Sequence, residues 1–192
     1  RDLHSFPTRR SSDLEMIAIW SCLIRRAFIE KHHIRLHETP GAAYQDTAFI
    51  FFINSLAEKV RVIPDLLYHY NKTNTNASTA SSRYSMAPSI EYNWMADWCL
   101  EHPDVGMYVR PVLCRCRYGS YMWNMSRIEP SDRMEFARAM QSDFIDDWNW
   151  IDVRMFGKQE FDVYLIAKNN PGEMVDIFRG FVKKSRQQSQ SA

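Results

Sequence analysis

Hydrophobic and polar positions follow a helical period through the second half of this chain. Met86, Ile90, Trp94 and Trp98 recur at four-residue steps, which places one apolar stripe along a helix. The spacing predicts a second long helix from about Val105 to Ile128 and a third after Pro130, where Ser131 can act as the cap. One or two shorter helices are expected between Lys158 and Lys184, broken at Pro171–Gly172. Residues 84–186 are therefore expected to form a helical bundle of four or five segments.

The first half has a mixed pattern. Helical spacing predicts one helix from Trp20 to His33 and another from about Asp46 to Glu58. Residues 60–63 then alternate like a half-buried strand, and residues 66–70 read as a partner strand. Two helices followed by a two-stranded piece are typical of the closing part of an α/β domain, so the expected fold is a mainly α fragment of such a domain.

The two ends of the chain do not follow this pattern. Residues 4–14 resemble the translation of a widely used short-read sequencing adapter, so we exclude residues 1–14 from fold reasoning. On that interpretation the reading frame starts inside a gene. A disordered basic arm is the alternative. The polar tail at 187–192 is expected to be disordered.

Composition narrows the class of protein. The chain has 24 basic and 23 acidic residues, and 45% of its residues are hydrophobic. This balance gives no electrostatic reason to expect a nucleic acid partner. No apolar run approaches the roughly 20 residues that a membrane span needs. Its four cysteines lack the spacing of a disulfide framework or a zinc site, which favours a reducing cytosol.

One carboxylate stands out as candidate chemistry. Pro40 and Gly41 break the preceding segment, and Gln45–Asp46–Thr47 then opens an apolar run. Asp46 is the residue that we expect to carry a reaction. The alternative is an ordinary helix cap, because Asp is among the commonest capping residues.

Residues 19–79 resemble the C-terminal part of the catalytic domain of family-2 glycosyltransferases of the GT-A type. The pieces that carry the resemblance, in order, are Trp20, Leu23, Arg25–Arg26, His33–Ile34–Arg35–Leu36, Gln45–Asp46 and Leu67–Tyr68–His69–Tyr70. Residues 15–83 would then be the acceptor side of the catalytic domain, followed by the helical region.

The resemblance implies an inverting transfer of a sugar from a nucleotide-sugar to a glycan or polyol acceptor, in surface glycan or polysaccharide synthesis. It makes Asp46 the catalytic base and Gln45 and Trp20 acceptor contacts. Lys72, Asn76 and Ser78, in a polar linker, would approach the donor diphosphate. A divalent metal, Mg or Mn, would be held by an Asp-x-Asp upstream of this chain, so the fragment alone is expected to be inactive. A cytoplasmic location follows, and peripheral association with the inner face of the membrane stays open.

A rival interpretation is a non-catalytic helical interaction module that carries a degenerate transferase remnant. Cys22 and Asn71 stand where the family often has Lys and Arg, as in a dead site. The module would dock a partner or an anionic polymer through Arg110, Arg115 and Tyr118. The alternative for this stretch is that Arg covers the solvent face while the aromatic rings fill the core.

Two further groupings predict little. His32, His33 and His37 lack the spacing of a metalloprotease zinc site. Asp143, Asp146, Asp147 and Asp152 read as a helix end and turn rather than as a pair of catalytic carboxylates.

Overall fold

The computed structural model describes residues 18–39, 43–63, 65, 67–69 and 84–179. Its elements in chain order are η3 (Ile19–Ser21), α1 (Arg26–Lys31), α2 (Gln45–Leu56), α3 (Ala87–Glu101), α4 (Pro103–Arg127), α5 (Arg133–Asp146), η5 (Trp148–Trp150), η6 (Val153–Met155) and α6 (Lys158–Asn169). Residues 171–179 are also helical.

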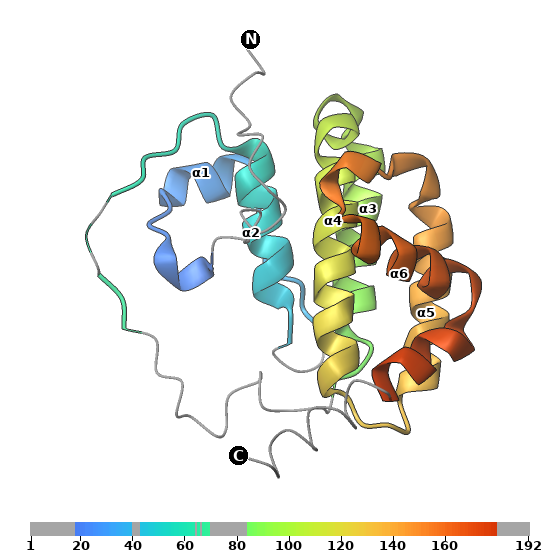
Figure 1. Cartoon of the computed structure of the whole chain (residues 1–192). Coiled ribbons are helices and arrows are strands. Elements are labelled where there is room, and N and C mark those ends of the chain that lie inside the picture. The colour runs from blue at the N-terminus through green and yellow to red at the C-terminus, as the bar shows by residue number, and fades with distance from the viewer. Residues whose placement is uncertain (1–17, 40–42, 64, 66, 70–83, 180–192) are drawn as a thin grey trace.

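The helices stack in three layers. Figure 1 shows α3 and α4 side by side in the middle, with α2 on one side and α5 and α6 on the other, and the packing between elements agrees. The short α1 lies beyond α2. The central pair therefore contacts every longer helix, and its side chains form most of the core.

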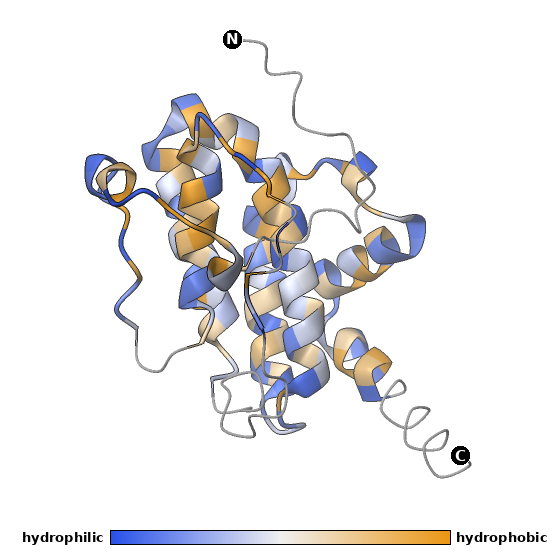
Figure 2. Ribbon diagram, turned by 90° about the vertical axis from the view of Figure 1, so that its left-hand side faces the viewer, coloured by the Kyte–Doolittle hydropathy of each residue, from blue (hydrophilic) through white to orange (hydrophobic). Residues whose placement is uncertain are grey.

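Buried side chains from all three layers belong to one hydrophobic cluster. It includes Ile50 of α2, Tyr92 and Met95 of α3, Tyr121 of α4 and Phe144 of α5. Hydrophobic and hydrophilic residues alternate along the helices in Figure 2, as expected for helices that bury one face. Residues on both sides of position 83 thus contribute to the same core.

Aromatic rings join α2 to α3. The Phe52 ring lies 4.9 Å from Trp94 and 5.2 Å from Trp98, centroid to centroid. Such ring pairs add about 0.5–1.5 kcal/mol each beyond the area that they bury. The expected stripe on α3 therefore faces α2 through its two tryptophans, while Ile90 is half exposed. Tyr92, Met95 and Cys99 form a second, fully buried face of the helix.

α3 and α4 approach most closely at Gly106. A Cβ built on Gly106 would collide with the carbonyl oxygen of Cys99. Real Cβ atoms do not come that near to backbone, so only glycine allows this crossing. The tight approach follows the short connection at His102, which caps α3 by donating its N–H to the Trp98 carbonyl.

The expected two-stranded piece is not present in the described residues. Residues 60–63, 65 and 67–69 adopt no strand. Val60, Val62 and Leu67 are 71%, 88% and 72% exposed. A strand is stable when its backbone pairs with a neighbour and its apolar face is covered, and nothing in the described part does either. The expected α/β class is therefore wrong for this part of the chain, and the fold there is helical.

Two local expectations are also corrected. The helix expected from Trp20 to His33 is split into η3 and α1 by the extended residues 22–25. Ser131 does not cap α5, since the N-cap is Asp132 and its side chain makes no capping bond. By contrast, long helices lie close to the expected bounds at Ala87–Glu101, Pro103–Arg127 and Lys158–Asn169.

Several expectations fall outside the described residues. They concern the adapter-like segment 1–14, the tail 187–192 and the proposed donor contacts Lys72, Asn76 and Ser78.

Candidate functional site

The start of α2 carries Gln45 and Asp46, the pair that the resemblance singles out. The residue before them, Tyr44, is the N-cap and has a φ of 67°, in the left-handed region. A non-glycine residue pays about 1–2 kcal/mol for that conformation. Asp46 lies in the first helical turn rather than at the cap. Strained residues of this kind concentrate at functional sites, so the backbone conformation of Tyr44 marks the start of α2 as a candidate site.

Hydrogen bonds tie this junction to the middle of the fold. Gln45 Nε2 donates to the carbonyl oxygen and to the hydroxyl of Thr39, both at 3.0 Å. The Thr39 hydroxyl in turn donates to Glu91 Oε1 on α3, at 3.2 Å. Thr39 thus accepts from one side chain and donates to the other. This chain of hydrogen bonds connects Gln45, at the start of α2, through Thr39 to Glu91 of α3.

Glu91 is the centre of the cluster. Its side chain is 1% exposed, although Glu is rarely buried without partners. His37 Nδ1 lies 3.0 Å from Glu91 Oε1, and the His37 ring stacks on Trp94 with 4.3 Å between centroids. The second carboxyl oxygen, Oε2, has no hydrogen-bond partner among the described residues.

Burial raises the pKa of Glu91, because a charge is less stable away from water. His37 and the Thr39 hydroxyl act in the opposite direction, since both stabilise the carboxylate. The negative charge of Asp46 adds to the increase, which places the two carboxyl groups within electrostatic reach of each other. Carboxyl groups with a shifted pKa in concave sites are candidates for function.

A pocket of about 300 Å³ lies beside Glu91. Its walls include Thr39, Tyr84, Ser85, Met86, Ile90 and Glu91. Asn124 of α4 braces this region, since its amide donates to the Ser85 carbonyl at 2.8 Å and accepts from the Tyr44 hydroxyl at 3.3 Å. The pocket wall and the start of α2 are therefore held by the same buried side chain.

Trp20, the third residue implied by the resemblance, lies in η3. Its side chain is 41% exposed, and its ring centroid is 6.3 Å from that of Tyr68. η3 packs against α2. The structure thus links Gln45 to Glu91 through Thr39 and places Asp46 within electrostatic reach of Glu91, while Trp20 pairs with Tyr68.

Glu91, His37 and Thr39 were not identified as one site from the sequence. Glu91 follows Ile90 within an apolar stripe, which reads as a surface position of an amphipathic helix. The signal in the sequence is that Glu91 is a charged residue directly beside Tyr92, on the side of α3 that faces the core. Its partners lie more than 50 positions away, so no local spacing reports them.

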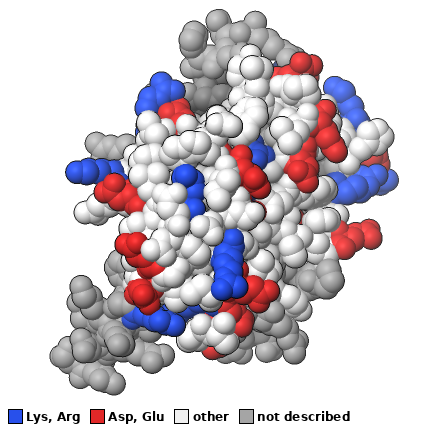
Figure 3. Space-filling view, turned by 90° about the vertical axis from the view of Figure 1, so that its right-hand side faces the viewer, with Lys and Arg blue, Asp and Glu red and all other residues white. Residues whose placement is uncertain are grey.

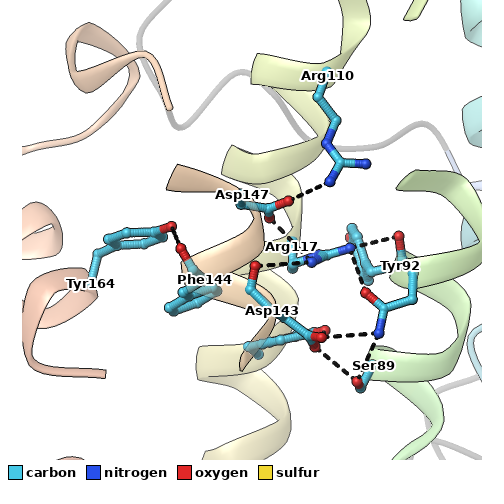
Figure 4. Close-up of polar contacts among 10 residues, drawn as sticks. Ser89, Tyr92, Arg110, Arg117, Asp143, Phe144, Asp147 and Tyr164 are labelled. Atoms are coloured by element: carbon cyan, nitrogen blue, oxygen red, sulfur yellow. Dashed lines mark hydrogen bonds and ion pairs between the residues drawn. The ribbon is translucent and has the colours of Figure 1, made fainter. Parts of the chain in front are cut away.

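A second polar cluster is buried between α3, α4 and α5 (Figure 4). Arg117 Nη2 donates to the Tyr92 carbonyl at 2.7 Å, and Arg110 Nη2 donates to Asp147 Oδ1 at 2.7 Å. Arg117 Nη1 also lies 3.2 Å from Asp147 Oδ2. Burial raises the pKa of Asp147, and the two guanidinium groups oppose that increase. Two cations face two carboxylates here, so the cluster is balanced in charge.

Asp143 completes this cluster. It accepts from the Ser89 hydroxyl at 2.8 Å, the Tyr121 hydroxyl at 2.5 Å and the Asn93 amide at 2.9 Å. Asp143 and Asp147 do lie at the end of α5, as the sequence predicts, and both carboxyl groups are in addition buried in one network with Arg117. Their i, i+4 spacing on α5 was the available signal. All four charged partners face protein groups, so we assign the network to stability.

The basic and aromatic side chains proposed for docking do not form a surface. Arg110 and Tyr118 are each 5% exposed. Arg115 donates to the Met155 carbonyl and to Glu160. The alternative, with arginines on the solvent face, is wrong for Arg110 and Arg117 as well. On the face shown in Figure 3, basic and acidic residues are interspersed rather than gathered by sign.

Among the described residues, no three His, Cys, Asp or Glu side chains gather as metal ligands would. In the same residues, no helix combines the length and apolarity needed to cross a bilayer.

Comparison with known proteins gives no family assignment: no protein-family model, curated protein or solved structure matches the chain.

Proposed function

We propose that this chain forms the acceptor side of an inverting glycosyltransferase, which moves a sugar from a nucleotide-sugar to a hydroxyl of a glycan or polyol. The observation that carries the proposal is the connection from Gln45 through Thr39 to Glu91. It joins the pair implied by the resemblance to a pocket of small-molecule size. Ligand sites usually combine such a concave surface with a few convergent polar groups.

Asp46 is the proposed general base. As the acceptor oxygen attacks the anomeric carbon, the Asp46 carboxylate takes the hydroxyl proton and the bond from that carbon to the donor diphosphate breaks. A positioned base of this kind contributes about 10²- to 10⁴-fold to the rate. Asp46 is half-buried in the first turn of α2.

Gln45 and Trp20 have supporting roles in this proposal. Gln45 holds Thr39, and through it the wall of the pocket. The exposed Trp20 ring offers an aromatic face on which a sugar ring can stack. Lys72, Asn76 and Ser78 are proposed for the donor diphosphate, with Lys72 as a point charge on phosphate. No step of this mechanism runs through a metal ion.

The proposed location is the cytoplasm, with peripheral contact to the inner face of the membrane for an enzyme of surface polysaccharide synthesis. The four cysteines are free, as thiols are in a reducing compartment.

The experiment that tests the proposal begins with the source gene. The DNA is read across the Leu14–Glu15 junction, and the intact product is incubated with UDP-glucose, UDP-N-acetylglucosamine or GDP-mannose and with polyol or glycan acceptors. Release of nucleoside diphosphate that depends on the acceptor is the expected result. An intact gene without an upstream Asp-x-Asp, whose product transfers none of these sugars, would favour the non-catalytic interaction module. That module would need a different docking surface, because Arg110 and Tyr118 are buried.

A further inference from the structure

One histidine and one glutamate from different parts of the fold form an ionisable pair. His37 Nδ1, on the segment before α2, lies 3.0 Å from Glu91 Oε1 of α3. The Glu91 side chain is 1% exposed, whereas the His37 side chain is 29% exposed. One partner therefore reaches water while the other is enclosed, and the contact between the two elements includes groups that gain and lose protons.

Neighbouring contacts attach this pair to the start of α2. Thr39 donates its hydroxyl to the same oxygen of Glu91 and accepts from Gln45, the first residue of α2. The His37 ring stacks on Trp94 of α3, with 4.3 Å between centroids. Because Thr39 is bonded to both side chains, a change in the charge of Glu91 acts on the start of α2 as well.

The charge of the pair depends on how many protons it holds. With one proton, the buried carboxyl group is either neutral or faces an imidazolium. Without it, a carboxylate is buried beside a neutral ring, and its hydrogen bonds to the ring and to Thr39 supply no positive charge. The two groups are in contact, so the pair titrates as a unit.

The closed arrangement binds protons more tightly than an open one. Burial and, to a smaller extent, the negative charge of Asp46 raise the pKa of Glu91, whereas His37 and Thr39 oppose the increase. An exposed Glu91 would titrate near its ordinary value of 4.5. Closing is therefore favoured at low pH, and that advantage is lost as the pH rises through the values of the closed pair.

Charged groups on the other helices around α3 have contacts of their own. On α4, Arg117 faces Asp147 and the Arg127 guanidinium lies over the Trp123 ring. On α5, Asp143 accepts from three side chains of the buried network. This leaves the pair on the α2 side as a separate titrating unit.

We propose that His37 and Glu91 form a pH-dependent switch, which holds the segment before α2 against α3 while the pair is protonated and releases it as the pair loses its protons at higher pH. The switch goes beyond the proposed function, because it does not depend on sugar transfer. Release frees Thr39 from α3 and changes the position of Gln45 at the start of α2.

The test measures amide hydrogen exchange in the full 192-residue chain between about pH 5 and 9, the range that includes histidine titration. The amides of Thr39 and Thr47 report on the segment and on the first turn of α2, because they donate to the carbonyls of His37 and Tyr44. Each rate is divided by that of an unstructured amide at the same pH. These protection factors are expected to fall by at least about tenfold as the pH rises, while the Asn170 amide at the end of α6 keeps its protection.

Variants then identify the groups responsible. Glu91→Gln removes the buried titrating group, so the protection factors of the folded variant should change by less than about twofold over the same range. His102→Gln is the matched control. The His102 ring also stacks on a tryptophan, Trp98, at 4.4 Å, and its Nδ1 also lies 3.0 Å from an oxygen, but that oxygen is a backbone carbonyl. This variant should keep the wild-type pH dependence.

A second measurement needs no variant and applies if Glu91→Gln fails to fold. In the wild type, the NMR signals of the Glu91 carboxyl carbon and of the His37 ring nitrogens should change over the pH range in which the protection factors fall. Four results would overturn the switch: protection of Thr39 and Thr47 that does not change with pH, an equal fall at Asn170, a folded Glu91→Gln protein that keeps the fall, or side-chain signals that change in a different pH range.

Discussion

Gln45 and Thr39 are joined by two hydrogen bonds, because one amide nitrogen of Gln45 lies 3.0 Å from both the carbonyl oxygen and the hydroxyl of Thr39. The pair connects Thr39 to the first residue of α2. It also aligns the Thr39 hydroxyl with Glu91. The geometry of the pocket therefore depends on a contact between two residues only six positions apart.

This relationship predicts the effect of removing one hydroxyl. Thr39→Val keeps the shape of the side chain but loses the bond to Glu91 and the side-chain acceptor for Gln45, so we expect a loss of about 1–2 kcal/mol in the free energy of unfolding. Thr39→Ser keeps the hydroxyl and should recover most of that loss. Urea unfolding of both variants makes the comparison. Equal losses in the two variants would show that packing of the methyl group, rather than the hydrogen bonds, matters at this position.

Gly106 and Gly119 both lie in α4 and should respond in opposite directions to alanine. At Gly106 the new Cβ would collide with the Cys99 backbone, so Gly106→Ala should cost at least about 1–3 kcal/mol. At Gly119 the nearest atom is Arg115 Nη1 at 3.6 Å, an ordinary contact. Gly119→Ala should therefore stabilise the helix by about 0.5–1 kcal/mol.

Thermal unfolding followed by circular dichroism distinguishes the two alanine variants. A Gly106→Ala protein as stable as the wild type would contradict the close crossing of α3 and α4.

The buried network predicts a large penalty for losing Arg117. Its guanidinium faces Asp147 and the Tyr92 carbonyl inside the bundle, and removing one partner leaves a buried charge poorly compensated. Arg117→Met should therefore cost about 3–5 kcal/mol. The matched control is Arg154→Met, which breaks an exposed pair with Asp152. That variant should unfold at the wild-type denaturant concentration. Similar midpoints for the two variants would contradict a structural role for the network.

The raised pKa of Glu91 predicts how its contribution to stability changes with pH. Burial is the main cause of the increase, and the folded protein therefore binds this proton more tightly than the unfolded chain, whose carboxyl titrates near 4.5. The contribution is fully present below that value and is lost as the pH rises through the folded pKa. His37, the Thr39 hydroxyl and Asp46 are the groups that act on this carboxyl.

The free energy of unfolding of Glu91→Gln, relative to that of the wild type, should accordingly be higher at about pH 7 than at about pH 4. Denaturant unfolding at both pH values measures the difference, with Glu101→Gln as the exposed control. A variant that loses more stability at the higher pH would indicate that the ion pair with His37, rather than burial, dominates.

The sequence indicated the long helices because their periodicity is local. Spacing indicated the α3 stripe that faces α2, but the fully buried face of α3 at Tyr92, Met95 and Cys99 was not predicted. The alternation at residues 60–63 misled us, since it has the period of a strand but lacks a sheet to pair with in the described residues. A strand depends on distant partners, and a helix does not.

The candidate site was predictable only in part. Asp46 and Gln45 stand out because they open an apolar run, whereas Glu91 becomes notable only when Thr39 and His37 are brought to it across the fold. The buried charges of Arg117 and Asp147 were missed for the same reason. Their neighbours in the sequence suggest an exposed helix face, and only the packing of three helices shows that they neutralise each other.

The measurement that tests the central claim most directly is sugar transfer by the intact gene product carrying Asp46→Asn. The account predicts that acceptor-dependent release of nucleoside diphosphate falls by at least about 10²-fold, while binding of the nucleotide-sugar is unchanged. Asp162→Asn, an exposed carboxylate on α6, should transfer at the wild-type rate. Near-wild-type turnover by the folded Asp46→Asn protein would contradict Asp46 as the base and, with it, the proposed acceptor site.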